Sequence, residues 1–283
     1  MIEVKILKDS LHPFHLQNDL SRLITIQVKY PRMYHSEVLT HRILSKNFSS
    51  SRAIPFLKML KKVRDTPAIP IRFGANQSGM VMKETSCDDP EQAEVIWMTA
   101  LREATNRANQ LHLLNTHKTL CNRLIEPFQH IEGVITGEMS GWLTFLRLRL
   151  NTDADENIQE LAKAIHKAIK ASRPTINDWH LPFTDHEEYE RIPLDVLKKV
   201  SVARCARVSY INHGKVDRSL EDDIILYERL ASSGHFSPFE HVNSAYKTDR
   251  HTNFQFWQQL RVEVDSITKN TDCLLALYDK FFK

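Results

Sequence analysis

Residues 40–52 read Thr-His-Arg-Ile-Leu-Ser-Lys-Asn-Phe-Ser-Ser-Ser-Arg and concentrate several chemically useful side chains in one stretch. Apolar residues at helical spacing accompany His41 and Arg42, and serines and an asparagine follow them. Because serine and asparagine compete with helical hydrogen bonds, we expect a helix to end near Ser45 and a loop to follow. Hydroxyls and backbone N–H groups between Arg42 and Arg52 suit an anion such as a phosphate.

The composition of the 283-residue chain argues against several classes of protein. Its hydrophobic content of 42% is enough for a core, and no stretch approaches the ~20 apolar residues of a membrane span. Residues 1–6 read as a strand and not as a signal peptide. The four cysteines lie far apart without a CxxC pair, so we expect a cytoplasmic protein with neither a disulfide framework nor a zinc site.

The common nucleotide-binding motifs do not occur in the sequence. The chain has 7 glycines, and none of them forms GxGxxG or GxxxxGKS/T, which argues against a Rossmann turn and a P-loop. The net charge of +3 is too small to indicate nucleic-acid binding. A nucleotide or a flavin would therefore be held by another architecture.

Hydrophobic periodicity predicts the elements that must position these side chains. Residues 2–6, 23–30 and 131–136 have the alternation or the β-rich composition of strands. We take the chain as one domain, residues 1–283, with an irregular connector at residues 172–192. Apolar stripes of helical period predict helices at residues 90–114, 118–125, 154–171, 194–210, 219–232 and 254–262.

Two further sets of polar residues stand against apolar surroundings. One set is Arg123, which precedes Glu126-Pro127, together with Arg149 at the end of Leu146-Arg147-Leu148-Arg149. The other set is Ala206-Arg207-Val208-Ser209-Tyr210, followed after a predicted helix by Gly234-His235-Phe236-Ser237-Pro238-Phe239-Glu240-His241.

These strings resemble the flavin-dependent thymidylate synthases, the ThyX family. The family's hallmark, RHRxxSxNxxSxR, matches residues 40–52 at every position but the first. Arg123 with Pro127 resembles the family's RxxxP segment, residues 145–158 resemble its FLxLR…AQxEI segment, and residues 206–241 resemble its ARVS…GHxSPFEH segment. In ordinary members the last segment precedes the hallmark, so the chain resembles a circularly permuted member of phage or bacterial type.

The resemblance implies an α+β fold, with a central antiparallel sheet flanked by helices. It implies a homotetramer with sites between subunits, FAD as cofactor, and NADPH and methylenetetrahydrofolate as cosubstrates. One carbon would pass from the folate to C5 of dUMP and give dTMP. The protein would then have to hold dUMP, flavin and folate in register while the reduced flavin supplies the difficult chemistry.

The resemblance also assigns roles to single residues. Ser50, Ser51, Arg52 and Arg123 would hold the nucleotide, chiefly at its phosphate. Arg149 would bind the uracil edge and stabilise negative charge on the ring, which makes Arg149 the candidate catalytic residue together with Ser50, the latter by positioning and not as a nucleophile. The flavin would be contacted by His41, Arg42, Asn47, His235, Ser237 and Glu240.

Two positions depart from the hallmark in a way that the rest of the chain must compensate. Thr40 stands where the family has an arginine, and Glu37 stands where it has a glutamine. A carboxylate near a phosphate is repulsive, so Glu37 does not inherit the role of that glutamine. We hypothesise that Gln259, as a substrate ligand, and Arg261, as a flavin ligand, supply the missing groups from the predicted helix at the far end of the chain.

Further departures keep other functions open. Phe48 replaces a usual glutamate, and Asp153 and Asp155 replace a usual His/Gln pair. The enzyme could therefore make a 5-hydroxymethyl nucleotide, or use dCMP in place of dUMP, as in the modification of phage DNA inside a bacterial host. A third alternative is a homologue that binds nucleotide without turnover, against which the intact substrate-binding arginines argue.

Overall fold

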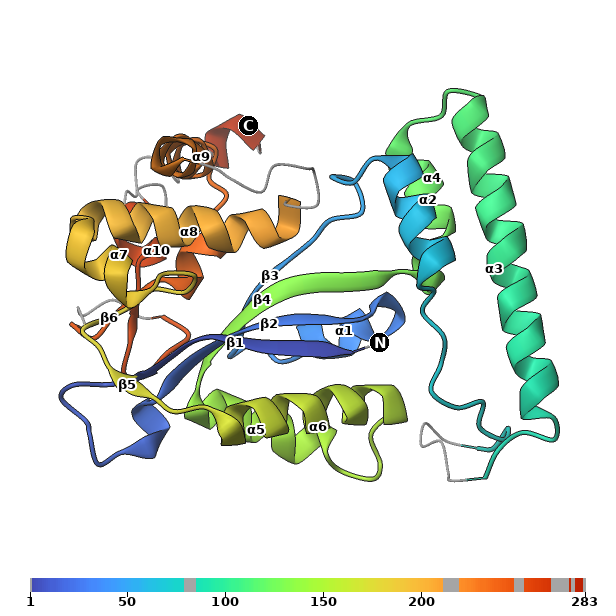
Figure 1. Ribbon diagram of the computed structural model, residues 1–283, viewed down its shortest axis with the longest axis horizontal. Helices are drawn as coiled ribbons and strands as arrows, with labels where there is room; N and C mark the ends of the chain where they lie inside the picture. Colours follow the sequence, from blue (N-terminus) through green and yellow to red (C-terminus); the bar gives the residue numbers. More distant parts are fainter. Residues whose placement is uncertain are drawn as a thin grey trace.

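A five-stranded sheet runs through the middle of the computed structural model (Figure 1). Its order is β3-β4-β2-β1-β5, antiparallel except for the parallel pair of β1 and β5. The predicted α+β fold with a central antiparallel sheet is therefore confirmed. The strands are β1 Glu3–Leu11, β2 Leu23–Pro31, β3 Ser45–Phe48, β4 His130–Glu138 and β5 Thr175–Ile176. The structure describes residues 2–78, 85–210, 219–246, 252–265, 275 and 278–281.

The first face of the sheet carries an apolar core. Helices α5 (Met139–Arg149) and α6 (Glu156–Ala171) cover it, below the sheet in Figure 1. Helix α5 inserts Trp142 and Phe145, which are almost fully buried. Because side chains alternate along a strand, one set of residues of β2 and β4 meets these helices. That set is Ile24, Ile26, Val28, Tyr30, Ile131 and Ile135.

The second face is covered by α8 (Leu194–Tyr210) and the 3-10 helix η4 (Ser237–His241), with α9 (Leu220–Ser232) packed on α8 (Figure 1). Its centre is polar. The Thr25 hydroxyl lies 2.7 Å from His180 Nε2 and 2.6 Å from the Thr136 hydroxyl, which lies 2.7 Å from His241 Nδ1. Burial lowers the pKa of both histidines, to about 3 for His241, so this buried chain of hydrogen bonds is neutral.

Three helices form an arm at one end of the sheet (Figure 1, right): α2 (Phe56–Asp65), α3 (Pro90–Leu113) and α4 (Lys118–Leu124). The bounds of α3 and α4 agree closely with the predicted helices at residues 90–114 and 118–125. Their shared core holds Ile54, Phe56, Met59, Leu60, Val63, Leu101, Ala108, Cys121, Ile125 and Phe128. Within the described part of the chain, no helix combines the length and the apolar character needed to cross a bilayer.

The remaining elements are short. Residues 172–192, predicted as an irregular connector, contain β5, β6 and α7, and whether residues 1–283 form a single domain stays a prediction. A second sheet has the order β6-β7-β8. The short elements are β6 Trp179–His180, β7 Asn243–Ser244, β8 Gln258–Gln259, α1 His35–Leu39, α7 His186–Arg191, α10 Arg261–Val264, η1 Asp19–Ser21, η2 Arg32–Tyr34 and η3 Glu126–Phe128.

The expected helix through His41 to Ser45 is wrong, because α1 ends at Leu39 and residues 45–48 form β3. Pairing with the edge of β4 overrides the local pattern, with Ser45 opposite Thr136 and Phe48 opposite Gly133. A glycine is required there: a Cβ at Gly133 would lie 2.7 Å from the Asn47 carbonyl oxygen. The edge of the sheet therefore determines the conformation of the hallmark.

The predicted helix at residues 254–262 is also wrong. Residues 258–259 form β8 and a helix begins only at Arg261. The buried Glu138 carboxylate, at the end of β4, accepts hydrogen bonds from the backbone N–H groups of Gln255, Phe256 and Trp257 at 2.8, 2.6 and 3.1 Å. The Trp257 indole is fully buried and donates to the Ser21 carbonyl at 2.7 Å. These contacts hold residues 255–257 in a bend at the end of β4, and β8 follows directly.

We expect Glu138→Gln to lower the free energy of unfolding by about 2–3 kcal/mol, because hydrogen bonds to a buried charged group are worth ~1.5–3 kcal/mol. The glutamine amide would place its own N–H donors against backbone N–H groups that now donate to the carboxylate. Urea unfolding measures the change, with Glu160→Gln as the control, since the Glu160 side chain is 44% exposed. A loss at Glu138 within about 0.5 kcal/mol of wild type would contradict this role.

Candidate active site

The side chain of Asn47 joins β3, which carries part of the hallmark at residues 40–52, to the motif segment at residues 206–241. Its Nδ2 donates to the Cys205 carbonyl in α8 at 3.0 Å, and its Oδ1 accepts from the Ser237 hydroxyl at 3.2 Å. These partners lie 158 and 190 residues away in the chain. The structure therefore brings two of the sequence-predicted flavin ligands, Asn47 and Ser237, into direct contact.

Gln259 and Arg261 also reach this neighbourhood. Gln259 Nε2 donates to the hydroxyl of the buried Ser45 at 2.7 Å, and Arg261 Nη1 donates to Glu240 Oε1 at 2.5 Å. Thr40, the gap in the hallmark, instead contacts Glu37 and Arg149. The structure thus places Gln259 and Arg261 beside other motif residues, and their replacement of the missing glutamine and arginine stays a prediction.

Arg149, in the last turn of α5, is surrounded by residues of α1 and the turn that follows it. Its Nε donates to His41 Nε2 at 2.9 Å, and its Nη1 donates to Glu37 Oε2 at 3.2 Å. Its Nη2 donates to the Glu37 carbonyl at 3.2 Å and to the Thr40 hydroxyl at 3.0 Å. The two hallmark candidates Arg149 and His41 are therefore in contact, and both departures from the hallmark lie against Arg149.

These contacts determine the protonation of His41. Burial, the Arg149 cation and Lys46 lower its pKa to about 4, so the ring is neutral at pH 7. Since Nε2 accepts from Arg149, the proton of the neutral ring is on Nδ1. His41 therefore presents a hydrogen-bond donor, and not a positive charge, to a ligand on its Nδ1 side.

The same contacts occupy most of the N–H donors of Arg149. A guanidinium has five N–H groups, and Glu37, Thr40 and His41 take four of those of Arg149. One N–H on Nη1 remains. Beside it, Glu37 Oε1 has no hydrogen bond among the described residues, and burial and Asp155 raise the pKa of this carboxyl against the opposing effect of Arg149. Arg149 and Glu37 thus form a paired donor and acceptor.

The loop that follows β3, residues 49–52, is called the serine loop below, and helix α4 fixes its position. The buried Asn122 donates through Nδ2 to the Ser51 carbonyl at 2.7 Å and to the Ile54 carbonyl at 2.9 Å. Ser50 and Arg52 remain exposed, and the Arg52 backbone N–H donates to the Ser50 hydroxyl at 3.3 Å. The loop is therefore held by its backbone, while two of the candidate phosphate ligands stay open to solvent.

Arg123 follows Asn122 on α4 and is exposed as well. It borders a hollow of about 480 Å³ lined by Arg32, Met33, His35, Ser36, Arg123, Glu126 and Pro127. Ser36 is the neighbour of Glu37 in α1. The hollow therefore adjoins the end of α4 and the helix that carries the Arg149 contacts.

Two of the sequence-predicted flavin ligands, Arg42 and His235, lie outside the contacts described above. Within the described part of the chain, the Arg42 side chain makes no hydrogen bond or ion pair with another candidate, and it is exposed. His235 is exposed too, with Nδ1 2.8 Å from the Ser233 hydroxyl. Both are accessible to a ligand, but no contact orients them toward Asn47 or His41.

Several residues that shape the site carry no role in the sequence patterns. The exclusion of Glu37 from a phosphate site does not connect it with Arg149, which lies 112 residues away. Asn122 and Lys46 adjoin Arg123 and Ser45, but neither has a predicted role. Lys46 Nζ donates to the His41 and Leu44 carbonyls, and burial lowers its pKa to about 8. Proximity to a motif was the only signal available for either.

Arg207, in the ARVSY string, has a structural contact. It is buried, its Nε donates to Asp223 Oδ1 at 2.7 Å, and its Nη2 donates to the Asp222 carbonyl at 2.9 Å. The ion pair joins α8 to α9. The motif residue therefore stabilises the scaffold behind Cys205.

A family model described as "Thymidylate synthase complementing protein" (Thy1) matches residues 22–175, more than half of the chain. The match contains the hallmark, Arg123 and Arg149, and residues 206–241 lie outside it. No curated protein matches the chain in sequence.

Two solved structures are similar to the chain, both of a UMP/dUMP methylase, PolB from Streptomyces cacaoi. The form bound with 5-Br dUMP is 14% identical, with a TM-score of 0.48 over 60% of this chain and 90% of that one. The form bound with 5-Br UMP is 14% identical, with a TM-score of 0.47 over 60% and 88%.

We expect an NMR titration to find His41 neutral at pH 7 and titrating near pH 4. Its folded pKa lies below the unfolded value of about 6.5, so the stability that it contributes is present above that pH and falls as the pH drops toward 4. Arg149→Gln should raise the pKa, whereas Arg147→Gln, at the exposed neighbouring arginine, should not. An unshifted His41 in the wild type, or equal effects of both variants, would contradict the contact.

Proposed function

This chain belongs to the Thy1 family of thymidylate synthase complementing proteins, and on that premise we propose that it transfers one carbon from methylenetetrahydrofolate to C5 of dUMP, with reduction by FADH2 and NADPH, to give dTMP. The observation that carries the proposal is the Asn47 bridge. It joins two motif segments that lie far apart in the sequence, as a shared flavin and nucleotide site requires.

The nucleotide is proposed to lie along the serine loop and the hollow beside Arg123. Ser50, Ser51, Arg52 and Arg123 bind its phosphate, through backbone N–H groups, a hydroxyl and two exposed guanidinium groups. Arg149 then binds the pyrimidine and stabilises negative charge on the ring when C5 becomes nucleophilic. Its contacts with His41 and Thr40 hold that cation in place before the nucleotide arrives.

The flavin is proposed to lie against His41, Arg42, Asn47, His235, Ser237, Glu240 and Arg261. Their chemistry suits the group: exposed His235 and Arg42 are donors for phosphate and ribose oxygens, and the neutral His41 is a donor for a ring atom. The Ser237 hydroxyl, which donates its proton to Asn47, offers its oxygen as an acceptor for a ribose hydroxyl. When bound, the reduced flavin supplies the reducing electrons. The residues of this chain bind it, orient it and hold the Nδ1 proton of His41.

A second candidate reaction uses dCMP, and Glu37 is the observation that favours it. Glu37 Oε1 offers an acceptor beside the remaining N–H of Arg149. Cytosine fits this pair with its amino group on Glu37 and its acceptor N3 on Arg149. In that register uracil presents a carbonyl oxygen to the carboxylate, and it fits the pair only when shifted so that its N3–H meets Glu37. The product would then be a 5-methyl or 5-hydroxymethyl cytosine nucleotide, and water capture of the one-carbon adduct would likewise give 5-hydroxymethyl-dUMP.

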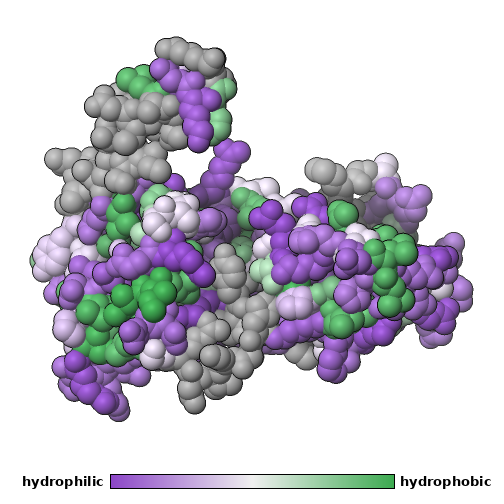
Figure 2. Space-filling model, turned by 90° about the horizontal axis from the view of Figure 1, so that it is seen from above, coloured by the Kyte–Doolittle hydropathy of each residue, from purple (hydrophilic) through white to green (hydrophobic). Residues whose placement is uncertain are grey.

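We also propose a homotetramer in the cytoplasm. Apolar side chains are exposed at the end of the molecule formed by α2, α3 and α4, visible as green areas among purple on the right of Figure 2. They support the burial of this end against other subunits. The exposed apolar residues of the arm are Leu57, Val95, Ile96, Leu113, Leu114, Leu120 and Leu124.

The proposed function predicts a yellow protein whose flavin absorbance is bleached by NADPH, and dTMP as the product from dUMP by mass spectrometry. Arg149→Gln should lower kcat about 100-fold, because it removes a donor to developing charge, while FAD stays bound. Arg147→Gln should leave kcat unchanged. A colourless protein that does not bind FAD, or a fully active Arg149→Gln variant, would overturn the proposal.

Glu37→Gln separates the two candidate substrates. An amide donates to the uracil carbonyl where a carboxylate repels it, so the ratio of dUMP to dCMP affinity should rise about tenfold, equal to ~1.4 kcal/mol. Calorimetric titration of both nucleotides measures the ratio. Glu156→Gln is the matched control, since Glu156 pairs with Arg72 outside the site. An unchanged ratio would remove Glu37 from base recognition.

A further inference from the structure

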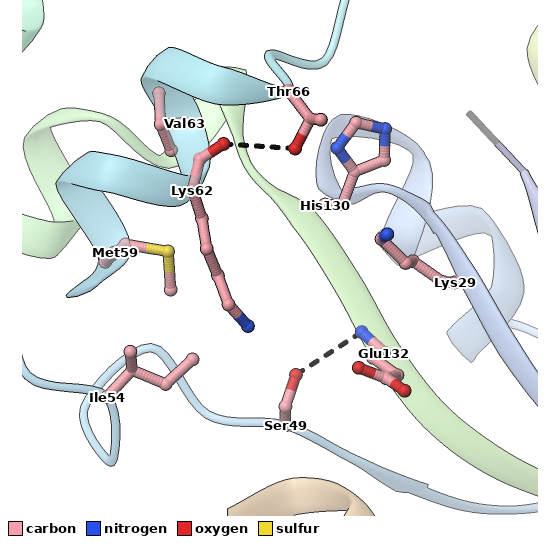
Figure 3. A pocket seen from close by; sticks show the side chains of 9 residues that line it. All are labelled: Lys29, Ser49, Ile54, Met59, Lys62, Val63, Thr66, His130 and Glu132. Carbon is pink, nitrogen blue, oxygen red and sulfur yellow. Dashed lines mark hydrogen bonds between the residues drawn. The ribbon is translucent and has the colours of Figure 1, made fainter. Parts of the chain in front are cut away.

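A separate cavity of about 270 Å³ lies between α2 and the second face of the sheet (Figure 3). No role assigned above involves any residue that lines it, although Ser49 at its floor begins the serine loop. The lining residues are Lys29, Ser49, Ile54, Met59, Lys62, Val63, Thr66, His130 and Glu132.

The cavity is on the opposite side of the sheet from Arg149. Lys29 alternates with Val28 and Tyr30, and Glu132 alternates with Ile131, and these apolar neighbours face α5 and α6. Lys29 and Glu132 therefore face the second side. A ligand in this cavity would be separated from Arg149 by the sheet itself.

The Lys62 ammonium is the group in this cavity that a ligand would stabilise most. Its side chain extends from α2 across the cavity, with Nζ toward Ser49 and Glu132 (Figure 3). Burial lowers its pKa and the Glu132 carboxylate opposes that effect, but no hydrogen bond or ion pair to Nζ occurs among the described residues. A partly buried ammonium without a direct hydrogen-bond acceptor costs free energy, which a bound anion would recover.

The other polar groups leave one position for such an anion. The Ser49 hydroxyl accepts the Glu132 backbone N–H at 3.3 Å, so its own proton is free to donate. Lys29, on the far wall, already pairs with Glu3 at 3.0 Å. The Glu132 carboxylate accepts from Gln27 at 2.6 Å and repels an anion from its side. The favourable position therefore lies between Lys62 and Ser49.

We propose that this cavity binds a small oxyanion, a carboxylate or a phosphate, between the Lys62 ammonium and the Ser49 hydroxyl. Ile54, Met59 and Val63 form the apolar wall beside it and take the body of the ligand. The cavity is smaller than the ~300–1,000 Å³ of pockets for drug-sized ligands, so the ligand is compact. The site goes beyond the proposed function, because it depends neither on the flavin nor on the pyrimidine nucleotide.

The test uses the purified full chain with two probes, inorganic phosphate and hexanoate. Binding is followed by NMR at the Met59 methyl group, which lies in the wall of the cavity. Lys62→Met should weaken binding about tenfold to hundredfold, since a charged hydrogen bond is lost. Lys61→Met is the control, because Lys61 lies on the same helix with its side chain 77% exposed.

Saturable binding of either probe that weakens in Lys62→Met alone supports the site, and the tighter probe identifies the ligand as a phosphate or as a carboxylate with an apolar body. The proposal is overturned if neither probe shifts the Met59 signal of the wild type. It is also overturned if Lys62→Met binds as the wild type does, or if both variants weaken binding equally. Thermal unfolding of Lys62→Met checks that the fold remains, as expected when a methionine retains the apolar stem.

Discussion

The amide of Asn47 is the interaction on which the proposed site depends. It lies on a four-residue edge strand, and it ties that strand to the backbone of α8 and to Ser237. Because side chains alternate along β3, neighbouring residues of this strand face opposite sides of the sheet. Asn47 and Ser45 face the second side, whereas Phe48 packs against the rings of Tyr30 and His35 on the first. One short strand thus connects the two groups of candidate residues, and pairing with β4 holds it in place.

The order of the motifs along the chain matters little to this arrangement, because each segment is fixed to the sheet independently. Glu138 and Trp257 hold the stretch at residues 255–257 at the end of β4 and beside η1. The neutral hydrogen-bond chain from His180 to His241 holds η4 against the middle of the same strands. Segments that lie far apart in the sequence can therefore meet in one neighbourhood, provided that these buried polar contacts are complete.

The sequence predicted the parts that local patterns determine. Helices α3, α6 and α8 follow the apolar period, and motif spacing identified the family without reference to folding. The errors arose where distant contacts outweigh local preference: β3 forms because β4 offers an edge, and the backbone after Phe254 bends and does not form a helix because Glu138 binds it. The pairing of Glu37 with Arg149 spans 112 residues and leaves no local signal. The structure adds the contacts among candidates, and their roles remain proposals.

A double-mutant cycle between Asn47→Ala and Ser237→Ala, with FAD affinity as the readout, tests most directly whether the two segments form one flavin site. If they do, both single variants weaken FAD binding, and the pair shows a coupling free energy of about 0.5–1.5 kcal/mol. Effects that add to within about 0.3 kcal/mol, or single variants that bind FAD as the wild type does, would contradict a shared site built around Asn47.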